Sequence, residues 1–138
     1  MAERRSYELE NLCADTIAGA GYRIHQNPGA QQVAEARRQN GDVGDPGRNP
    51  DYLIEGHVFD CYSPREATAT RSVWSAVRKK VDQGQSQRIV INAQDWNGDL
   101  TRLQRQFDRW PLPDLKELVV LTRDGEIKQI TPRHRGGS

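Results

Sequence analysis

Apolar residues recur along the chain with two spacings, one helical and one typical of strands. Helical spacing, which places residues three and four positions apart on one face, predicts helices at 6–20, 66–82 and 99–109. Short apolar or alternating runs predict strands at 22–26, 88–92, 118–121 and 127–130. RIVIN at 88–92 and LVVL at 118–121 are almost continuously apolar, as is typical of strands buried on both faces of a sheet.

Residues 51–61, DYLIEGHVFDC, are predicted to form a β-hairpin. Glu55 and Gly56 suit its two-residue turn because glycine adopts positive φ without strain. The strand, helix and strand between 88 and 121 form a βαβ unit, whose strands are expected to be parallel with a right-handed crossover. The fold class that follows is α/β, with a mixed β-sheet flanked by helices.

Two segments interrupt this pattern. Residues 27–50 are rich in glycine and proline, and Val33 is the sizeable apolar residue of their AQQVAEARRQN stretch. We expect a mobile insertion or weakly docked loop there, in which a short helix can form. The C-terminal residues 131–138 are expected to be a disordered tail.

Length and composition limit the class of protein. The 138 residues, of which 35% are hydrophobic, suit one domain with one core. No apolar run reaches the ~18 residues that cross a membrane, so no membrane-spanning segment is expected. MAERRSYELE lacks the apolar core of a signal peptide. Two cysteines, Cys13 and Cys61, without a CxxC or Cys/His cluster, indicate buried thiols and no structural zinc.

The hairpin register brings two acidic residues together. With Glu55 and Gly56 at the turn, Asp51 lies opposite Asp60, on the same face of the sheet. Like charges placed opposite each other destabilise a sheet, so the pair either shares a proton or binds a cation. Mg²⁺ suits such a pair because it binds oxygen ligands and often takes one or two carboxylates. Two solvated strand ends are the alternative interpretation.

Two further charged residues are expected near this pair. Glu10 lies at the edge of the apolar face of the first helix, and Lys80 lies on the apolar side of the helix after the hairpin. Together with the two aspartates they form the catalytic set Glu10, Asp51, Asp60 and Lys80. Such a set suits phosphodiester cleavage, in which a metal bound by carboxylates activates a water and a lysine stabilises negative charge.

The charges are unevenly distributed. Residues 1–61 hold six Lys/Arg against ten Asp/Glu, whereas residues 62–90 hold six against two. A basic segment beside an acidic one suits contacts with phosphates around a metal site, although it can also be a solvated helix face. Arg71 and Lys79 in the basic segment are the candidate substrate-binding cations.

NPDYLIEGHVFDCYSP (49–64) resembles the C-terminal toxin domains of CdiA-type contact-dependent growth inhibition proteins, and more narrowly their tRNA nuclease branch. Weaker supporting segments are ELENLCADTIAGAGYRIHQNP (8–28), KKVDQGQSQRIVIN (79–92) and WPLPDLKELVVL (110–121). The resemblance covers most of 8–130. It implies a PD-(D/E)XK nuclease-like core, and it makes residues 1–138 a single nuclease toxin domain.

The resemblance also implies roles for individual residues. Glu10 matches the acid of the first helix, Asp51 the Asp of the PD motif, and Asp60 the acid of the (D/E)XK motif. Tyr62 stands where the motif has lysine, so Lys80 is the candidate for a relocated lysine and Gln85 for a neighbouring polar contributor that binds substrate.

The implied biology is a metal-dependent ribonuclease, using Mg²⁺, that cleaves tRNA in target bacteria. It would be secreted as part of a larger effector and delivered to the target-cell cytoplasm, and a cognate immunity protein would block it. Three alternatives stay open: a DNase of the same fold, a metal-independent RNase using His25, His57 or His134, and a binding module without catalysis.

Overall fold

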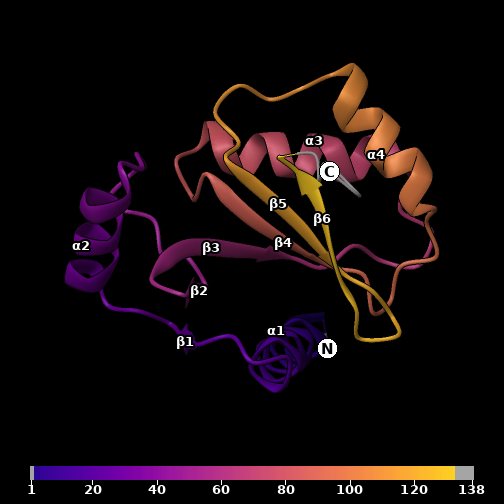
Figure 1. The fold of residues 1–138 in the computed structure, drawn as a ribbon. Helices are drawn as coiled ribbons and strands as arrows, with labels where there is room; N and C mark the ends of the chain where they lie inside the picture. Colours follow the sequence, from indigo (N-terminus) through magenta and orange to yellow (C-terminus); the bar gives the residue numbers. More distant parts are fainter. Residues whose placement is uncertain (1, 133–138) are drawn as a thin grey trace.

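A six-stranded sheet with helices on both faces forms the protein in the computed structural model, which describes residues 2–132 (Figure 1). The helices are α1 (Ala2–Gly19), α2 (Ala30–Asn40), α3 (Thr70–Asp82) and α4 (Leu100–Arg109). The strands are β1 (Ile24–Gln26), β2 (Tyr52–Ile54), β3 (His57–Tyr62), β4 (Arg88–Asn92), β5 (Glu117–Leu121) and β6 (Ile127–Thr131). They lie side by side in sequence order.

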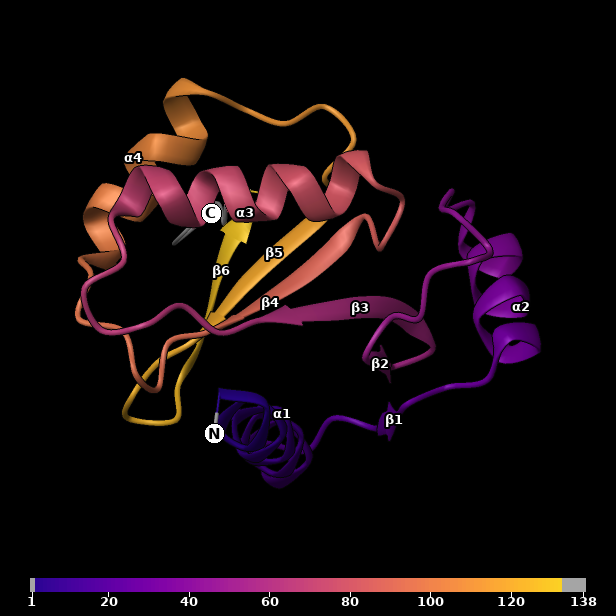
Figure 2. The same ribbon diagram turned by 180° about the vertical axis from the view of Figure 1, so that it is seen from behind.

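The sheet is parallel at its centre and antiparallel at both edges. Strands β3, β4 and β5 pair in parallel, joined by α3 and α4, whereas β1, β2 and β6 pair antiparallel with their neighbours. Helices α3 and α4 cover one face and α1 lies against the other (Figure 2). The predicted α/β fold with a mixed sheet flanked by helices is confirmed, as is the parallel βαβ unit.

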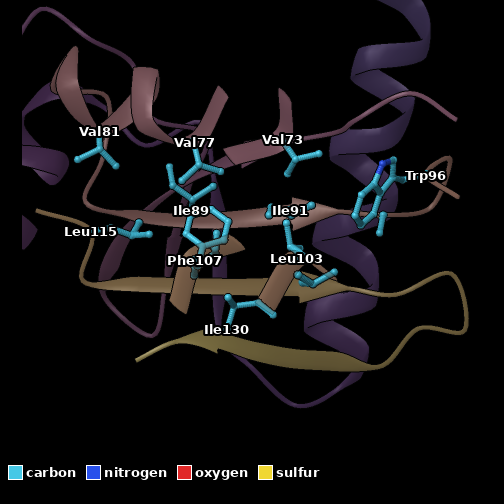
Figure 3. Packing of buried hydrophobic residues seen from close by; sticks show 13 residues of the cluster. Val73, Val77, Val81, Ile89, Ile91, Trp96, Leu103, Phe107, Leu115 and Ile130 are labelled. Atoms are coloured by element: carbon cyan, nitrogen blue, oxygen red, sulfur yellow. The ribbon is translucent and has the colours of Figure 1, made fainter. Parts of the chain in front are cut away.

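The larger core lies between the sheet and the helices α3 and α4 (Figure 3). Val73, Val77 and Val81 are spaced four residues apart, so they line one side of α3 and are buried. They pack in one cluster with Leu103 and Phe107 of α4 and with the sheet. This packing fixes the orientation of α3 about its own axis. It therefore also fixes the direction in which each charged residue of α3 points.

Helix α1 is held against the opposite face by apolar contacts and by two buried hydrogen bonds. The Tyr52 hydroxyl donates to the Glu10 carbonyl oxygen at 2.8 Å, and the Asn92 side-chain amide donates to the Leu9 carbonyl oxygen at 2.9 Å. Tyr52 and Asn92 are fully buried, so both bonds are shielded from water. The two expected buried thiols, Cys13 and Cys61, are free and lie in the apolar cluster between α1 and the sheet.

Segment 27–50 differs from the expectation of a mobile or weakly docked loop. Helix α2 occupies its middle, and Val33 and Ala36 pack against Val58 of β3. Beyond the helix, Asp42 accepts hydrogen bonds from Arg88 and, at 2.6 Å, from Lys116. Sequence patterning missed this docking because its apolar part is small and the rest of it consists of polar contacts between residues distant in sequence.

The Arg37 side chain makes a further attachment. It is 7% exposed, and its guanidinium donates to the carbonyl oxygens of Asp45, Gly84 and Gln85 at 3.3, 3.3 and 3.0 Å. It thereby joins the chain that precedes Asp51 to the turn that follows α3.

The predicted tail, 131–138, falls mostly outside the described residues. Thr131 is the last residue of β6, and residues 133–138 lie beyond the part that the structure describes. Within that part, no helix combines the length and hydrophobicity needed to cross a bilayer.

Replacing Arg37 tests whether this segment is fixed. Arg37→Met removes the guanidinium that bonds the Asp45, Gly84 and Gln85 carbonyl oxygens, the first two of which keep an amide donor. The variant should therefore lose about 1–3 kcal/mol of stability, and the Asp45 amide, bonded to Gly84 O at 2.9 Å, should exchange its hydrogen faster. Arg38→Met is the matched control, because Arg38 is exposed. Equal hydrogen exchange at the Asp45 amide in both variants would contradict this role of Arg37.

Candidate active site

The hairpin β2–β3 has the register that the sequence predicted. Its cross-strand pairs are Tyr52 with Phe59, Leu53 with Val58, and Ile54 with His57. Glu55 and Gly56 have φ values of 49° and 78°, and two positive φ values in succession are what a type I′ hairpin turn requires. The turn therefore sets the position of Asp51 and Asp60 at the far end of the hairpin.

The carboxylate of each aspartate accepts a hydrogen bond from a backbone amide on the opposite arm of the hairpin. The Asp51 amide donates to Asp60 Oδ1 at 3.1 Å, and the Cys61 amide donates to Asp51 Oδ2 at 2.8 Å. Asp60 is 1% exposed, whereas Asp51 is half-buried. The expected convergence of these two carboxylates is present in the structure.

Helix α3 and the turn after it contribute two further polar groups. Lys80 Nζ lies 2.5 Å from Asp60 Oδ2. The Gln85 amide donates to the Asn49 carbonyl oxygen at 3.0 Å and to Asp60 Oδ1 at 3.4 Å. Each oxygen of Asp60 therefore has a donor, while its neighbour Asp51 has no cation of its own within this set.

Glu10 reaches the same place from α1. It lies beside Asp51, within hydrogen-bonding reach of its carboxyl. The four predicted catalytic residues and Gln85 line one pocket of about 330 Å³, together with Cys61, Tyr62 and Ser63. The pocket lies at the first residue of β2, Tyr52, where β3 extends beyond its antiparallel partner.

Three acids against one lysine leave the pocket with an excess of negative charge. Burial, and then the adjacent Asp60 carboxyl, raises the pKa of Asp51 to about 8. Burial also raises the pKa of Glu10 above its usual value. Burial opposes the charge on Lys80, but Asp60 and Asp51 outweigh it and raise the Lys80 pKa. A cation placed between the acids would relieve this repulsion.

The two other predicted substrate-binding residues do not join this pocket. Arg71 and Lys79 are exposed on α3, and neither lines the pocket of the four acidic and basic residues. Arg71 lies in a separate hollow between α3 and α4.

The two histidines that the structure describes also lie apart from the acids. His25 is exposed on β1, and His134 lies outside the described residues. His57 lines a mainly apolar pocket on the other side of the hairpin; burial, followed by the nearby Arg88, lowers its pKa. A histidine-based mechanism in the acidic pocket therefore has no support from His25 or His57.

Sequence reasoning missed the backbone groups of the site. The Cys61 amide and the Asn49 carbonyl both hold functional side chains in place, but a residue's type gives no information about its backbone. The position of Cys61 follows from the hairpin register, so that contact could have been inferred from the pairing of Asp51 with Asp60.

Comparison with known proteins identifies the family. The profile of the family described as "Contact-dependent growth inhibition CdiA C-terminal domain" matches residues 48–127, a range that contains Asp51, Asp60, Lys80 and Gln85. The chain belongs to this family. The resemblance read from the sequence is thus confirmed.

A relative and a solved structure support this CdiA C-terminal domain assignment. "tRNA nuclease CdiA-2" of Burkholderia pseudomallei (strain 1026b) is 33% identical over 129 residues, which are 94% of this chain and 4% of that protein. The chain thus spans a small fraction of that relative's length. A CdiA-CT/CdiI toxin and immunity complex from Burkholderia pseudomallei matches with a TM-score of 0.78 and 32% identity, covering 96% of this chain and 89% of that one.

The raised pKa of Asp51 predicts a pH-dependent stability in metal-free buffer. An aspartate of the unfolded chain releases its proton near pH ~4, whereas folded Asp51 keeps its proton up to about pH 8. This contribution is complete below the lower value and is lost as the pH rises to the higher one. Asparagine resembles the protonated acid, so Asp51→Asn should melt increasingly above the wild type as the pH rises through this window.

The matched control is Asp15→Asn, because Asp15 is an exposed aspartate of α1. Its melting temperature, followed by circular dichroism, should differ from that of the wild type by the same amount at every pH. If the Asp51→Asn difference is equally flat, folding does not raise the pKa of Asp51 and the prediction is wrong.

Proposed function

We propose that this chain is a metal-dependent ribonuclease toxin that cleaves tRNA. The observation that carries the proposal is the convergence of Glu10, Asp51, Asp60 and Lys80 in one open pocket. Family membership and the relative named a tRNA nuclease support the reaction class and the substrate. A DNase acting through the same pocket is the second candidate, because acids that hold a metal and a lysine suit the cleavage of either kind of phosphodiester.

The donor set fits a hard divalent cation such as Mg²⁺. Asp51 and Asp60 offer carboxylate oxygens only, and burial together with the adjacent Asp60 carboxyl raises the pKa of Asp51 to about 8. Among residues 2–132, no three or more His, Cys, Asp or Glu side chains are already arranged to hold a metal. Two protein carboxylates completed by water and phosphate are nevertheless a usual Mg²⁺ arrangement.

When bound, such a cation polarises the phosphodiester and lowers the pKa of a water. The chain's own residues then have distinct tasks. Asp51 and Asp60 would hold the cation, and Glu10 would accept a proton from the attacking water because its carboxyl lies beside Asp51. Lys80, 2.5 Å from Asp60, would stabilise the negative charge that develops on the phosphate. Gln85 would orient Asp60 and the substrate.

The biological setting belongs to the same proposal. The chain would act as the toxin part of a larger secreted effector, delivered to the cytoplasm of a target cell. A cognate immunity protein would bind it in the producing cell, as the name of the matching toxin and immunity complex suggests.

The experiment that tests the proposal incubates the purified protein with total tRNA and with plasmid DNA, in Mg²⁺ and in EDTA. Cleavage of tRNA in Mg²⁺ that stops in EDTA is the expected result. Cleavage of DNA alone would keep the pocket and replace the substrate. Cleavage of tRNA that persists in EDTA would rule out the metal.

Asp60→Asn is the variant that assigns the cleavage to this pocket. It removes a negative charge from the centre of the site, so it should lower the rate of cleavage at least ~100-fold while the fold persists, as measured by circular dichroism. The exposed Asp15→Asn variant should keep the wild-type rate. Full activity of Asp60→Asn would place the reaction elsewhere.

A further inference from the structure

A hollow between α3 and α4 combines tryptophan and arginine side chains at the surface. Its volume is about 350 Å³, and its lining residues are Arg71, Trp74, Arg78, Gln106 and Trp110. The lining contains two cations and no carboxylate. Trp110 is 59% exposed, although a side chain of this size is usually highly buried.

Local contacts hold the aromatic part of the hollow in place. The Trp74 indole donates its N–H to the Trp110 carbonyl oxygen at 2.9 Å, and Trp74 packs against the core below α3. The Arg78 guanidinium lies over the Trp74 ring, 5.6 Å from its centroid. The backbone at Trp110 is therefore fixed from below, while its ring stays accessible.

Arg71 and Arg78 differ in whether an acidic side chain pairs with them. Arg78 lies 3.4 Å from Asp82, in a pair whose members are both more than half exposed, and such a pair contributes little. Among the side chains of residues 7–132, no ion pair is found for Arg71. An accessible ring flanked by two arginines is the combination that binds single-stranded nucleic acid, in which bases stack on aromatic rings and phosphates meet cations.

The exposed side of α3 connects this hollow to the acidic pocket. Successive helical residues are about 100° apart, so Lys80, Lys79 and Arg78 lead stepwise around the helix from the pocket to the hollow. Arg71 lies about two turns from Arg78 on nearly the same side. Lys79, Arg78 and Arg71 are all exposed, which makes this side of α3 predominantly basic.

The pocket on the opposite side of the sheet has a different lining. The pocket there is lined mainly by apolar residues, with Glu55 and Glu117 as its charged members. A phosphate backbone would be repelled by those carboxylates, so charge favours the α3 side.

We propose that the hollow of Arg71, Trp74, Arg78, Gln106 and Trp110 is a second RNA-binding site, in which an unpaired base stacks on Trp110 while Arg71 and Arg78 contact the adjacent phosphates. This proposal rests on the ribonuclease function proposed above. Lys79 lies on the path between the two sites and contacts the intervening backbone. The site adds affinity for the RNA and takes no part in the chemical step.

Steady-state cleavage of tRNA separates affinity from chemistry. Trp110→Ala should raise KM about tenfold, because stacking of one base is worth about 1–3 kcal/mol, and should leave kcat unchanged. Arg71→Ala should also raise KM and should weaken the dependence of binding on salt. An unchanged KM in Trp110→Ala would overturn the proposal.

Two matched controls lie away from α3. Tyr22→Ala removes an aromatic ring that is 44% exposed, and Arg23→Ala removes an exposed cation paired with Glu55 on the β1–β2 side. Both should retain the KM of the wild type. An equal rise in KM in these controls would show a general effect of charge or apolar surface and would also overturn the proposal.

A binding measurement keeps this test independent of cleavage. In the Asp60→Asn background, tRNA should quench tryptophan fluorescence and bind with an affinity measurable by anisotropy. Adding Trp110→Phe should remove most of the quench and keep the affinity, since phenylalanine still stacks, whereas adding Trp110→Ala should reduce both. If the wild type cuts no RNA, the proposed ribonuclease function is wrong. If Trp110→Ala then still lowers the affinity for tRNA, the proposed binding site is retained. Equal affinity in all three proteins would refute the binding site alone.

Discussion

The proximity of Asp51 and Asp60 is the constraint around which the proposed site is arranged. A type I′ turn at Glu55 and Gly56 fixes the register of β2 against β3, and that register places the two carboxylates at the same end of the hairpin. In isolation the arrangement is unfavourable, because two buried like charges repel each other. The fold compensates Asp60 with Lys80 and Gln85 and leaves Asp51 with a strongly raised pKa. We propose that a cation bound between the two carboxyls would favour their ionised forms.

Buried polar contacts, more than apolar packing, position the groups around this pair. Tyr52 and Asn92 hold the turn of α1 that carries Glu10, and Tyr52 is the neighbour of Asp51 in β2. Arg37 joins the chain before Asp51 to the turn that carries Gln85. The site therefore draws on elements that are distant in sequence, and segment 27–50 is part of its support. This geometry is the physical reason to expect that substitutions outside the pocket alter it.

Short local patterns in the sequence were enough to predict much of this arrangement. Strand β4 has three consecutive apolar residues at its centre and α3 repeats valine every fourth residue, so both elements and their parallel crossover follow from the sequence. The hairpin register followed from one Glu-Gly turn, and with it the Asp51–Asp60 pair. Segment 27–50 could not be predicted in the same way. Its docking rests on Arg37, Asp42, Arg88 and Lys116, and the pairing of charged residues across such distances leaves no periodic signal. Trp110 was missed for a related reason: the sequence does not show whether a tryptophan after a helix is buried or exposed.

The central claim is that burial and the neighbouring Asp60 keep Asp51 protonated near neutral pH, and that a divalent cation would displace this proton. Carbon-detected NMR of the Asp51 carboxyl, titrated with pH in the presence and absence of Mg²⁺, measures this directly. The account predicts a pKa near the value of about 8 given by the structure without metal, and a fall toward the ordinary aspartate range of about 4 with saturating Mg²⁺. An Asp51 that titrates in the ordinary range without metal, or a titration that Mg²⁺ leaves unchanged, would contradict it.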